Sequence, residues 1–78
     1  MNFILVGEKA KVSLVLAFLY EVVKKEEKIE VFDTNYEDAK FILNYKFNKS
    51  KLNIIVCKEK NVELFSKNVK VNGVIILP

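Results

Sequence analysis

Near the start of the chain, residues 3–7 read Phe3-Ile4-Leu5-Val6-Gly7, four consecutive apolar residues ended by a glycine. A continuous apolar run of this length is typical of a strand buried on both faces, as the strands of parallel sheets are. From Lys11 onward, apolar residues recur at spacings of three and four, which predicts a helix to about Lys25. A buried strand followed by an amphipathic helix is the first half of a βαβ unit.

The rest of the chain repeats this alternation. Further apolar runs at residues 29–32, 52–57 and 74–77 are predicted to be strands. After the second run, Thr34 followed three residues later by Glu37 matches a capping box and predicts that a helix begins there. Asn61 predicts the cap of a short third helix. The residues expected to face inward from the second helix are Ala39, Ile42, Leu43 and Phe47.

This order of elements predicts one α/β domain over residues 1–78, a small Rossmann-like three-layer sandwich. We expect four mainly parallel strands, in the order 3-2-1-4 or 2-1-3-4, with two long helices and one short helix. A second interpretation concerns the end of the chain, where Asn72-Gly73 separates two apolar runs. Asn-Gly is a strong hairpin signal, so residues 69–77 form either a hairpin or one parallel strand.

The composition excludes several chemistries, because the sequence has no His, no Arg and no Trp. Without His there is no Ser-His-Asp or Cys-His pair, and one cysteine cannot supply a zinc site. We therefore expect no catalytic residues, no metal site and no cofactor. Cys57 ends the third predicted strand, where it is either a small buried hydrophobe, the interpretation we favour, or a thiol activated by Lys58 and Lys60.

The same composition bears on location and partners. The longest apolar stretch, residues 14–20, is far shorter than the roughly 20 residues of a membrane span, and the first residues lack the pattern of a secretory signal. A lone cysteine fits a reducing compartment, so we expect a cytoplasmic protein. All positive charge comes from 13 Lys, seven of them in residues 46–78. Scattered lysines are typical of a solvated surface, so nucleic acid is not expected as a partner.

Polar side chains follow the first two predicted strands: Gly7, Glu8, Lys9 and Lys11 after the first, and Asp33 and Thr34 after the second. Ligands of open α/β sheets bind outside the carboxyl ends of the strands, so these six residues are the candidate ligand site. The stretch resembles a dinucleotide-binding half-domain of the nucleotide-binding domains that regulate potassium transport. It also resembles the deviant P-loop ATPases that position septa and chromosomes, through residues 31–35.

The first resemblance implies roles for two residues, Gly7 as the turn glycine beside a phosphate site and Asp33 as the acid that binds a ribose. The sequence departs from both families, since two of three glycines and the Gly-Lys-Ser/Thr unit are missing. Weak binding of a small nucleotide or phosphorylated ligand is therefore the alternative function. The carboxylates Glu8 and Asp33 also resemble the magnesium ligands of toprim enzymes, although Asn35 stands where that family has a second Asp.

The first helix is more apolar than one contact with a sheet requires. One face suffices to cover a sheet, and Leu14 and Phe18 lie off that face. A chain of 78 residues buries only about 60% of its unfolded surface, so further burial would help it. We therefore expect a non-catalytic interaction module that forms a homodimer through Leu14 and Phe18. The residues expected to cover the sheet are Val12, Val15, Leu16, Leu19 and Val23.

Overall fold

The structure is a computed structural model that describes residues 1–24 and 26–78. Strands and helices alternate along the chain, which confirms the predicted α/β class. The predicted end of the first helix, Lys25, lies outside the described residues. The elements are β1 (Asn2–Val6), α1 (Lys9–Val23), the 3-10 helix η1 (Glu26–Lys28), β2 (Ile29–Asp33), α2 (Ala39–Asn44), β3 (Leu52–Val56), the 3-10 helix η2 (Glu59–Asn61), α3 (Val62–Asn68) and β4 (Gly73–Ile76).

The four strands form one parallel sheet in the order β2-β3-β1-β4. Both predicted orders, 3-2-1-4 and 2-1-3-4, are wrong. The charges of β2 account for one edge of the observed order. β1 and β3 contain long runs of buried residues and occupy the centre, whereas β2 carries Glu30 and Asp33, whose charged groups favour an edge position. In the observed order the connection from β1 to β2 passes over β3.

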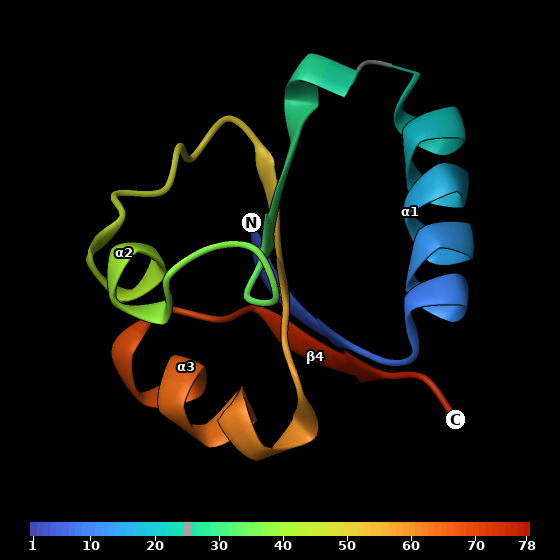
Figure 1. The fold of residues 1–78 in the computed structure, drawn as a ribbon. Helices are drawn as coiled ribbons and strands as arrows, with labels where there is room; N and C mark the ends of the chain where they lie inside the picture. Colours follow the sequence, from blue (N-terminus) through green and yellow to red (C-terminus); the bar gives the residue numbers. More distant parts are fainter. Residues whose placement is uncertain (25) are drawn as a thin grey trace.

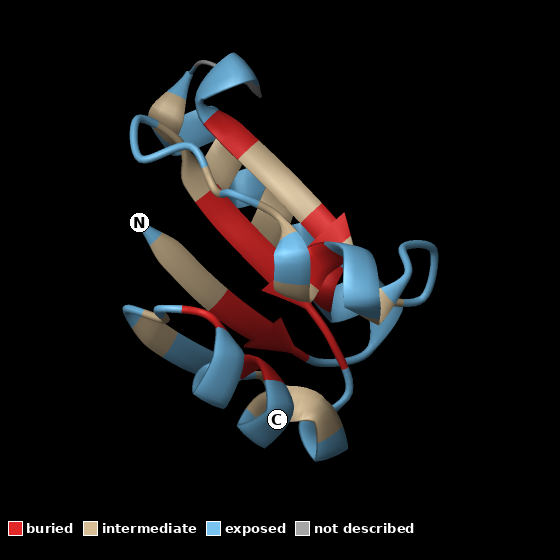
Figure 2. Cartoon of the chain, turned by 90° about the vertical axis from the view of Figure 1, so that its left-hand side faces the viewer, coloured by how far each residue is buried: buried red, intermediate tan, exposed pale blue. Residues whose placement is uncertain are grey.

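The helices cover the two faces of the sheet unequally. Figure 1 shows α1 alone on one face and α2 with α3 on the other, so the molecule has the three predicted layers. Figure 2 shows that the buried residues concentrate in the strands while the outer sides of the helices are exposed. The chain thus has one apolar cluster on each face of the sheet. The buried members beneath α1 are Leu5, Val12, Ile29, Ile54 and Val56; those on the face of α2 and α3 are Ile4, Val6, Phe32, Ile42, Ile55, Cys57, Phe65 and Val69.

The second helix begins later than its predicted capping box. Residues 34–37 form a turn, and Asp38 is the N-cap, its side chain accepting a hydrogen bond from the Lys40 N–H at 2.8 Å. The Thr34 hydroxyl instead donates to the Val56 carbonyl at 3.0 Å. Thr34 is therefore bound to the neighbouring strand β3, and Asp38 caps the helix in its place.

The end of the chain forms a parallel strand, so the hairpin interpretation of residues 69–77 is wrong. β4 pairs with β1 from Gly73 to Ile76. The Asn72 side chain accepts from the Asn2 N–H at 2.8 Å, and the Asn72 N–H donates to the Asn2 carbonyl at 2.7 Å. These two bonds to β1 occupy the residue that a two-residue hairpin turn would need.

Candidate functional site

The topology places the usual ligand crevice of an open α/β sheet between β1 and β3. These strands are neighbours, and the chain leaves β1 toward α1 on one face and β3 toward α3 on the other (Figure 1). Such a divergence of adjacent connections opens a crevice at the carboxyl edge of the sheet. The predicted ligand residues lie along this edge, and β3 stands between those that follow β1 and those that follow β2.

Three of the six predicted ligand residues come together there. Gly7, Lys9 and Asp33 line a hollow of about 120 Å³. The Lys9 ammonium donates to the Tyr36 hydroxyl at 3.4 Å, which joins the loop after β2 to the start of α1. Ligand pockets typically enclose about 300–1,000 Å³, so this hollow has room for only part of a nucleotide. The other residues that line it are Val12, Ser13, Leu16, Asn35, Tyr36 and Val56.

The other three predicted ligand residues lie outside this hollow. Glu8 is the exposed N-cap of α1 and makes no side-chain capping bond. The Lys11 ammonium donates to the carbonyl of Pro78, just beyond β4. Thr34 is held against β3 through its bond to Val56. The sequence thus placed all six residues at the carboxyl edge of the sheet, but it could not show which of their side chains come together there.

The Asp33 carboxylate already has a structural role. Its Oδ1 accepts a hydrogen bond from the Asn35 N–H at 2.9 Å, which stabilises the turn after β2. Over residues 1–24 and 26–78, no group of three or more His, Cys, Asp or Glu side chains is placed to hold a metal ion.

Cys57 is a buried residue of the core, with 4% of its surface exposed. Burial raises the pKa of the thiol to about 11, so the thiolate is scarce near neutral pH. Lys58 and Lys60 are both exposed. The interpretation of Cys57 as a small buried hydrophobe is confirmed.

The two residues predicted for self-association are both exposed on α1. Leu14, Phe18 and Val22, spaced by four residues, are 72%, 66% and 61% exposed and form one stripe. Lys11 lies three residues before Leu14 on the same side of the helix, and its bond to Pro78 shows that this side faces β4. The helical spacing allowed either Val22 or Val23 to face the sheet, and the structure places Val23 there and leaves Val22 exposed.

The strand beside this stripe is also apolar and exposed. Val74, Ile75 and Ile76 of β4 are 42%, 42% and 53% exposed. Ile75 pairs with Leu5, which belongs to the cluster beneath α1, so Ile75 lies on the same face of the sheet as that helix. We name the combined area of Leu14, Phe18, Val22 and Ile75 the α1–β4 surface. Val74 and Ile76 pair with Ile4 and Val6 of the other cluster, so they lie on the opposite face of the sheet along the open edge of β4.

A larger hollow, of about 530 Å³, lies at the opposite, amino edge of the sheet. The sequence analysis missed it, because its walls come from loops whose conformations local sequence patterns do not determine. Three of its lining residues are asparagines: Asn2 begins β1, Asn68 ends α3 and Asn72 directly precedes β4.

Comparison with known proteins gave no match, either to protein-family models, to curated proteins or to solved structures. In the part of the chain that the structure describes, none of the helices combines the length and the apolar character of a membrane span.

Proposed function

We propose that this protein is a non-catalytic interaction module that forms a homodimer through the α1–β4 surface. The observation that carries the proposal is the open edge of β4. Among the described residues β4 has a hydrogen-bonded neighbour, β1, on one side only. The four residues of β4 carry no charge. Proteins usually protect edge strands with charged side chains, proline, bulges or a covering loop, so an apolar unprotected edge favours pairing with another strand.

The opposite edge of the sheet provides an internal comparison. β2 is the other edge strand, and it carries Glu30 and Asp33 within its five residues. The Glu30 carboxylate accepts from the Tyr45 hydroxyl at 3.3 Å and lies 3.8 Å from the Lys51 ammonium. Charge and side-chain cover therefore protect β2 but not β4, which makes β4 the edge available for association.

A second copy of the chain fits this edge by symmetry. A two-fold axis perpendicular to the sheet would set β4 antiparallel to its own copy, extending the sheet to eight strands. The same axis keeps both α1 helices on one face of the extended sheet, with their apolar stripes directed toward each other above Ile75. Covering Phe18 alone contributes about 2 kcal/mol of apolar burial, and a symmetric dimer gains it twice.

Sedimentation velocity from about 1 to about 100 µM tests the proposal, because self-association depends on concentration. We expect a dimer for the natural sequence and a monomer for both Phe18→Lys and Ile75→Lys. The matched control is Phe41→Lys, which places the same charge at an exposed aromatic position on α2, away from the α1–β4 surface. Circular dichroism establishes that each variant is folded. A natural chain that stays monomeric throughout, and is no less stable with lysine at position 18, contradicts the proposal.

A further inference from the structure

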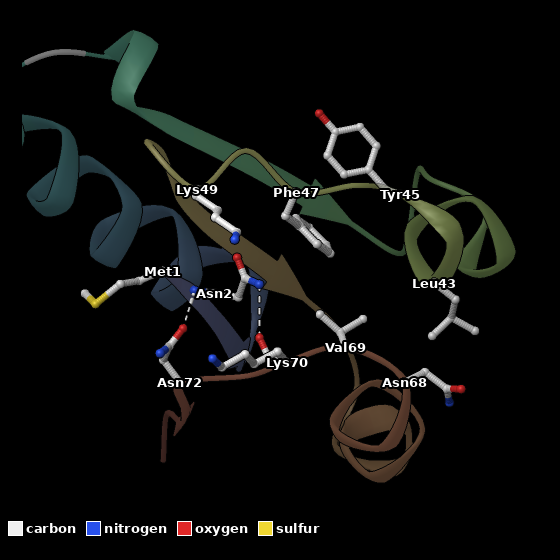
Figure 3. Close-up of a pocket in the computed structure, with 10 residues that line it drawn as sticks. All are labelled: Met1, Asn2, Leu43, Tyr45, Phe47, Lys49, Asn68, Val69, Lys70 and Asn72. Atoms are coloured by element: carbon white, nitrogen blue, oxygen red, sulfur yellow. Dashed lines mark hydrogen bonds between the residues drawn. The ribbon is translucent and has the colours of Figure 1, made fainter.

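The hollow at the amino edge of the sheet is open to solvent and is lined by three separate parts of the chain. These are the start of β1, the segment between α2 and β3, and the segment between α3 and β4 (Figure 3). Its volume of about 530 Å³ falls within the range of about 300–1,000 Å³ that small-molecule sites occupy. The residues that line it are Met1, Asn2, Leu43, Tyr45, Phe47, Lys49, Asn68, Val69, Lys70 and Asn72.

One wall of the hollow is apolar and aromatic. Figure 3 shows Phe47 and Val69 directed toward its interior. The Phe47 ring packs edge-to-face against Phe32 at 5.1 Å and against Tyr45 at 5.2 Å between ring centroids. The Tyr45 hydroxyl in turn donates to Glu30 at 3.3 Å, and burial and then the Glu30 carboxylate raise the pKa of Tyr45. The Phe47 ring is thus held from two sides, which gives the hollow a preformed flat apolar surface.

The other wall is cationic and rich in amides. Lys49 and Lys70 line it, and no Asp or Glu is among the lining residues that the structure describes. The described carboxylate nearest in the sheet, Glu30, is engaged by Tyr45 and Lys51. Lys49 comes from the segment before β3 and Lys70 from the segment before β4, so two separate parts of the chain each contribute a cation to the lining (Figure 3). Two lysines without a neighbouring carboxylate produce a positive potential that favours an anion.

The amides at the base of the hollow are held in fixed positions. Asn2 Nδ2 donates to the Lys70 carbonyl at 3.0 Å, and Asn2 Oδ1 accepts from Asn53 Nδ2 at 2.9 Å. Asn53 is fully buried, and it also donates to the Asn48 carbonyl at 3.1 Å. The Asn72 Oδ1 accepts from the Asn2 N–H. Rigid amides with remaining donors and acceptors can recognise the polar edge of a flat heterocycle.

We propose that this hollow binds a nucleoside monophosphate, with the base against Phe47 and the asparagine amides and the phosphate between Lys49 and Lys70. The aromatic wall accounts for a flat ring, and the lysine pair accounts for one compact anion. This site lies at the opposite edge of the sheet from the predicted Gly7 loop, and it is independent of the α1–β4 surface.

Isothermal titration calorimetry of the full chain with AMP, GMP, CMP and UMP tests the proposal. We expect at least one of the four to bind with a dissociation constant below about 1 mM. The matching nucleoside and inorganic phosphate, each offering half of the interactions, should bind at least tenfold more weakly. Lys49→Ala and Lys70→Ala should each weaken the monophosphate about tenfold, as loss of a charged hydrogen bond does.

Two control variants distinguish binding in this hollow from non-specific attraction of an anionic nucleotide to a basic protein. Lys46→Ala removes an exposed lysine from the same segment as Lys49 but outside the lining residues, and it should leave the affinity unchanged. Lys40→Ala, at an exposed position on α2 that lines neither hollow, should do the same. Circular dichroism confirms folding of each variant. The absence of binding by all four monophosphates, or equal losses for Lys46→Ala and Lys49→Ala, would overturn the proposal.

Discussion

Leu77 packs directly on the backbone of Gly7. A Cβ atom placed on Gly7 would lie 3.0 Å from both the Cβ and the Cδ1 of Leu77, closer than such carbon atoms normally approach. The Leu77 N–H donates to the Val6 carbonyl at 2.8 Å, which fixes Leu77 in this position. The resemblance to nucleotide-binding domains implied a turn glycine that lets a phosphate approach the backbone. In the structure, a glycine is favoured at position 7 for a different reason: the side chain of Leu77, which follows β4, packs closely against its backbone.

Gly7→Ala should therefore destabilise the protein by about 1–3 kcal/mol, because the added methyl group overpacks the contact with Leu77. Urea denaturation measures the change. The same substitution in a Leu77→Gly background has no opposing side chain to meet, because glycine lacks the Cβ atom as well, so its further effect should be below about 0.5 kcal/mol. A Gly7→Ala variant as stable as the natural chain would show that this contact adapts freely.

Asp38→Ala should destabilise the protein by about 1 kcal/mol, because it removes the acceptor that caps α2. Glu37→Ala is the matched control: Glu37 is exposed and was the partner in the predicted capping box, but it lies in the turn before the helix. Its loss should change stability by less than about 0.5 kcal/mol. Thermal unfolding measures the stability of the two variants. Equal losses of stability would favour a helix that begins at the predicted capping box of Thr34 and Glu37.

The raised pKa of Cys57 predicts a dependence of stability on alkaline pH. The thiol titrates from 9.0 in an ordinary environment but near 11 in the folded chain, so the unfolded state loses this proton first. The contribution of the buried neutral thiol is complete below pH 9 and is lost as pH rises to about 11. Cys57→Val removes the titrating group and should cost less than about 1.5 kcal/mol at neutral pH.

The measurement is the difference in unfolding free energy between the natural chain and Cys57→Val, since every other titratable group is common to both chains. As the pH rises from 9 to about 11, Cys57→Val should become more stable relative to the natural chain. The native thiol should also react slowly with a disulfide reagent at pH 8 and rapidly in denaturant. Rapid reaction of the folded protein would contradict the burial of Cys57.

At the Gly7 loop we predict only weak nucleotide binding, because the hollow there is small and Lys9 donates to Tyr36 across it. Calorimetry with NAD, NADP and ATP should give dissociation constants above about 10 µM, or affinities weaker than about −7 kcal/mol. Asp33→Ala identifies the site, since it would weaken only ligands held there by a ribose. Tighter binding that Asp33→Ala abolishes would reverse the order of the two functions considered for this chain.

Asn53→Ala should destabilise the protein by about 1–3 kcal/mol, since it removes the buried amide that donates to the acceptors on Asn2 and Asn48. The Asn53 Oδ1 has no partner among the described residues. Chemical denaturation measures the loss, and Asn44→Ala, at an exposed position on α2, serves as the reference. Equal stability of the two variants would show that the amide contributes nothing beyond its volume.

The sequence predicted the elements of this fold better than their arrangement. Apolar runs identified β1 and β3 because burial on both faces removes the alternation of polar and apolar residues. The order of the strands depends on which pairs bury most surface together, and no single run contains that information. Glu30 and Asp33 were a usable signal, since two charged residues in five mark β2 as an edge strand.

The candidate sites also differ in how far they could be predicted from the sequence. The excess apolarity of α1 was visible in Leu14 and Phe18, because helical periodicity alone separates them from the face that packs on the sheet. The exposure of Ile75 could not be predicted from the sequence, because it depends on β4 being an edge strand that α1 does not cover. The hollow beside Phe47 depends on loops that meet only in the folded chain, so no local pattern could predict it.

The position of β1 also has a consequence for synthesis of the chain. β1 is made first, yet its two partners come from residues about fifty and seventy positions later, as the pairs Phe3–Ile54 and Phe3–Gly73 show. An apolar strand that waits for distant partners is exposed while the ribosome works, and contacts of long sequence separation form slowly. We expect protection of β1 from proteolysis only after residues 73–76 have left the exit tunnel, which arrested chains of increasing length would reveal.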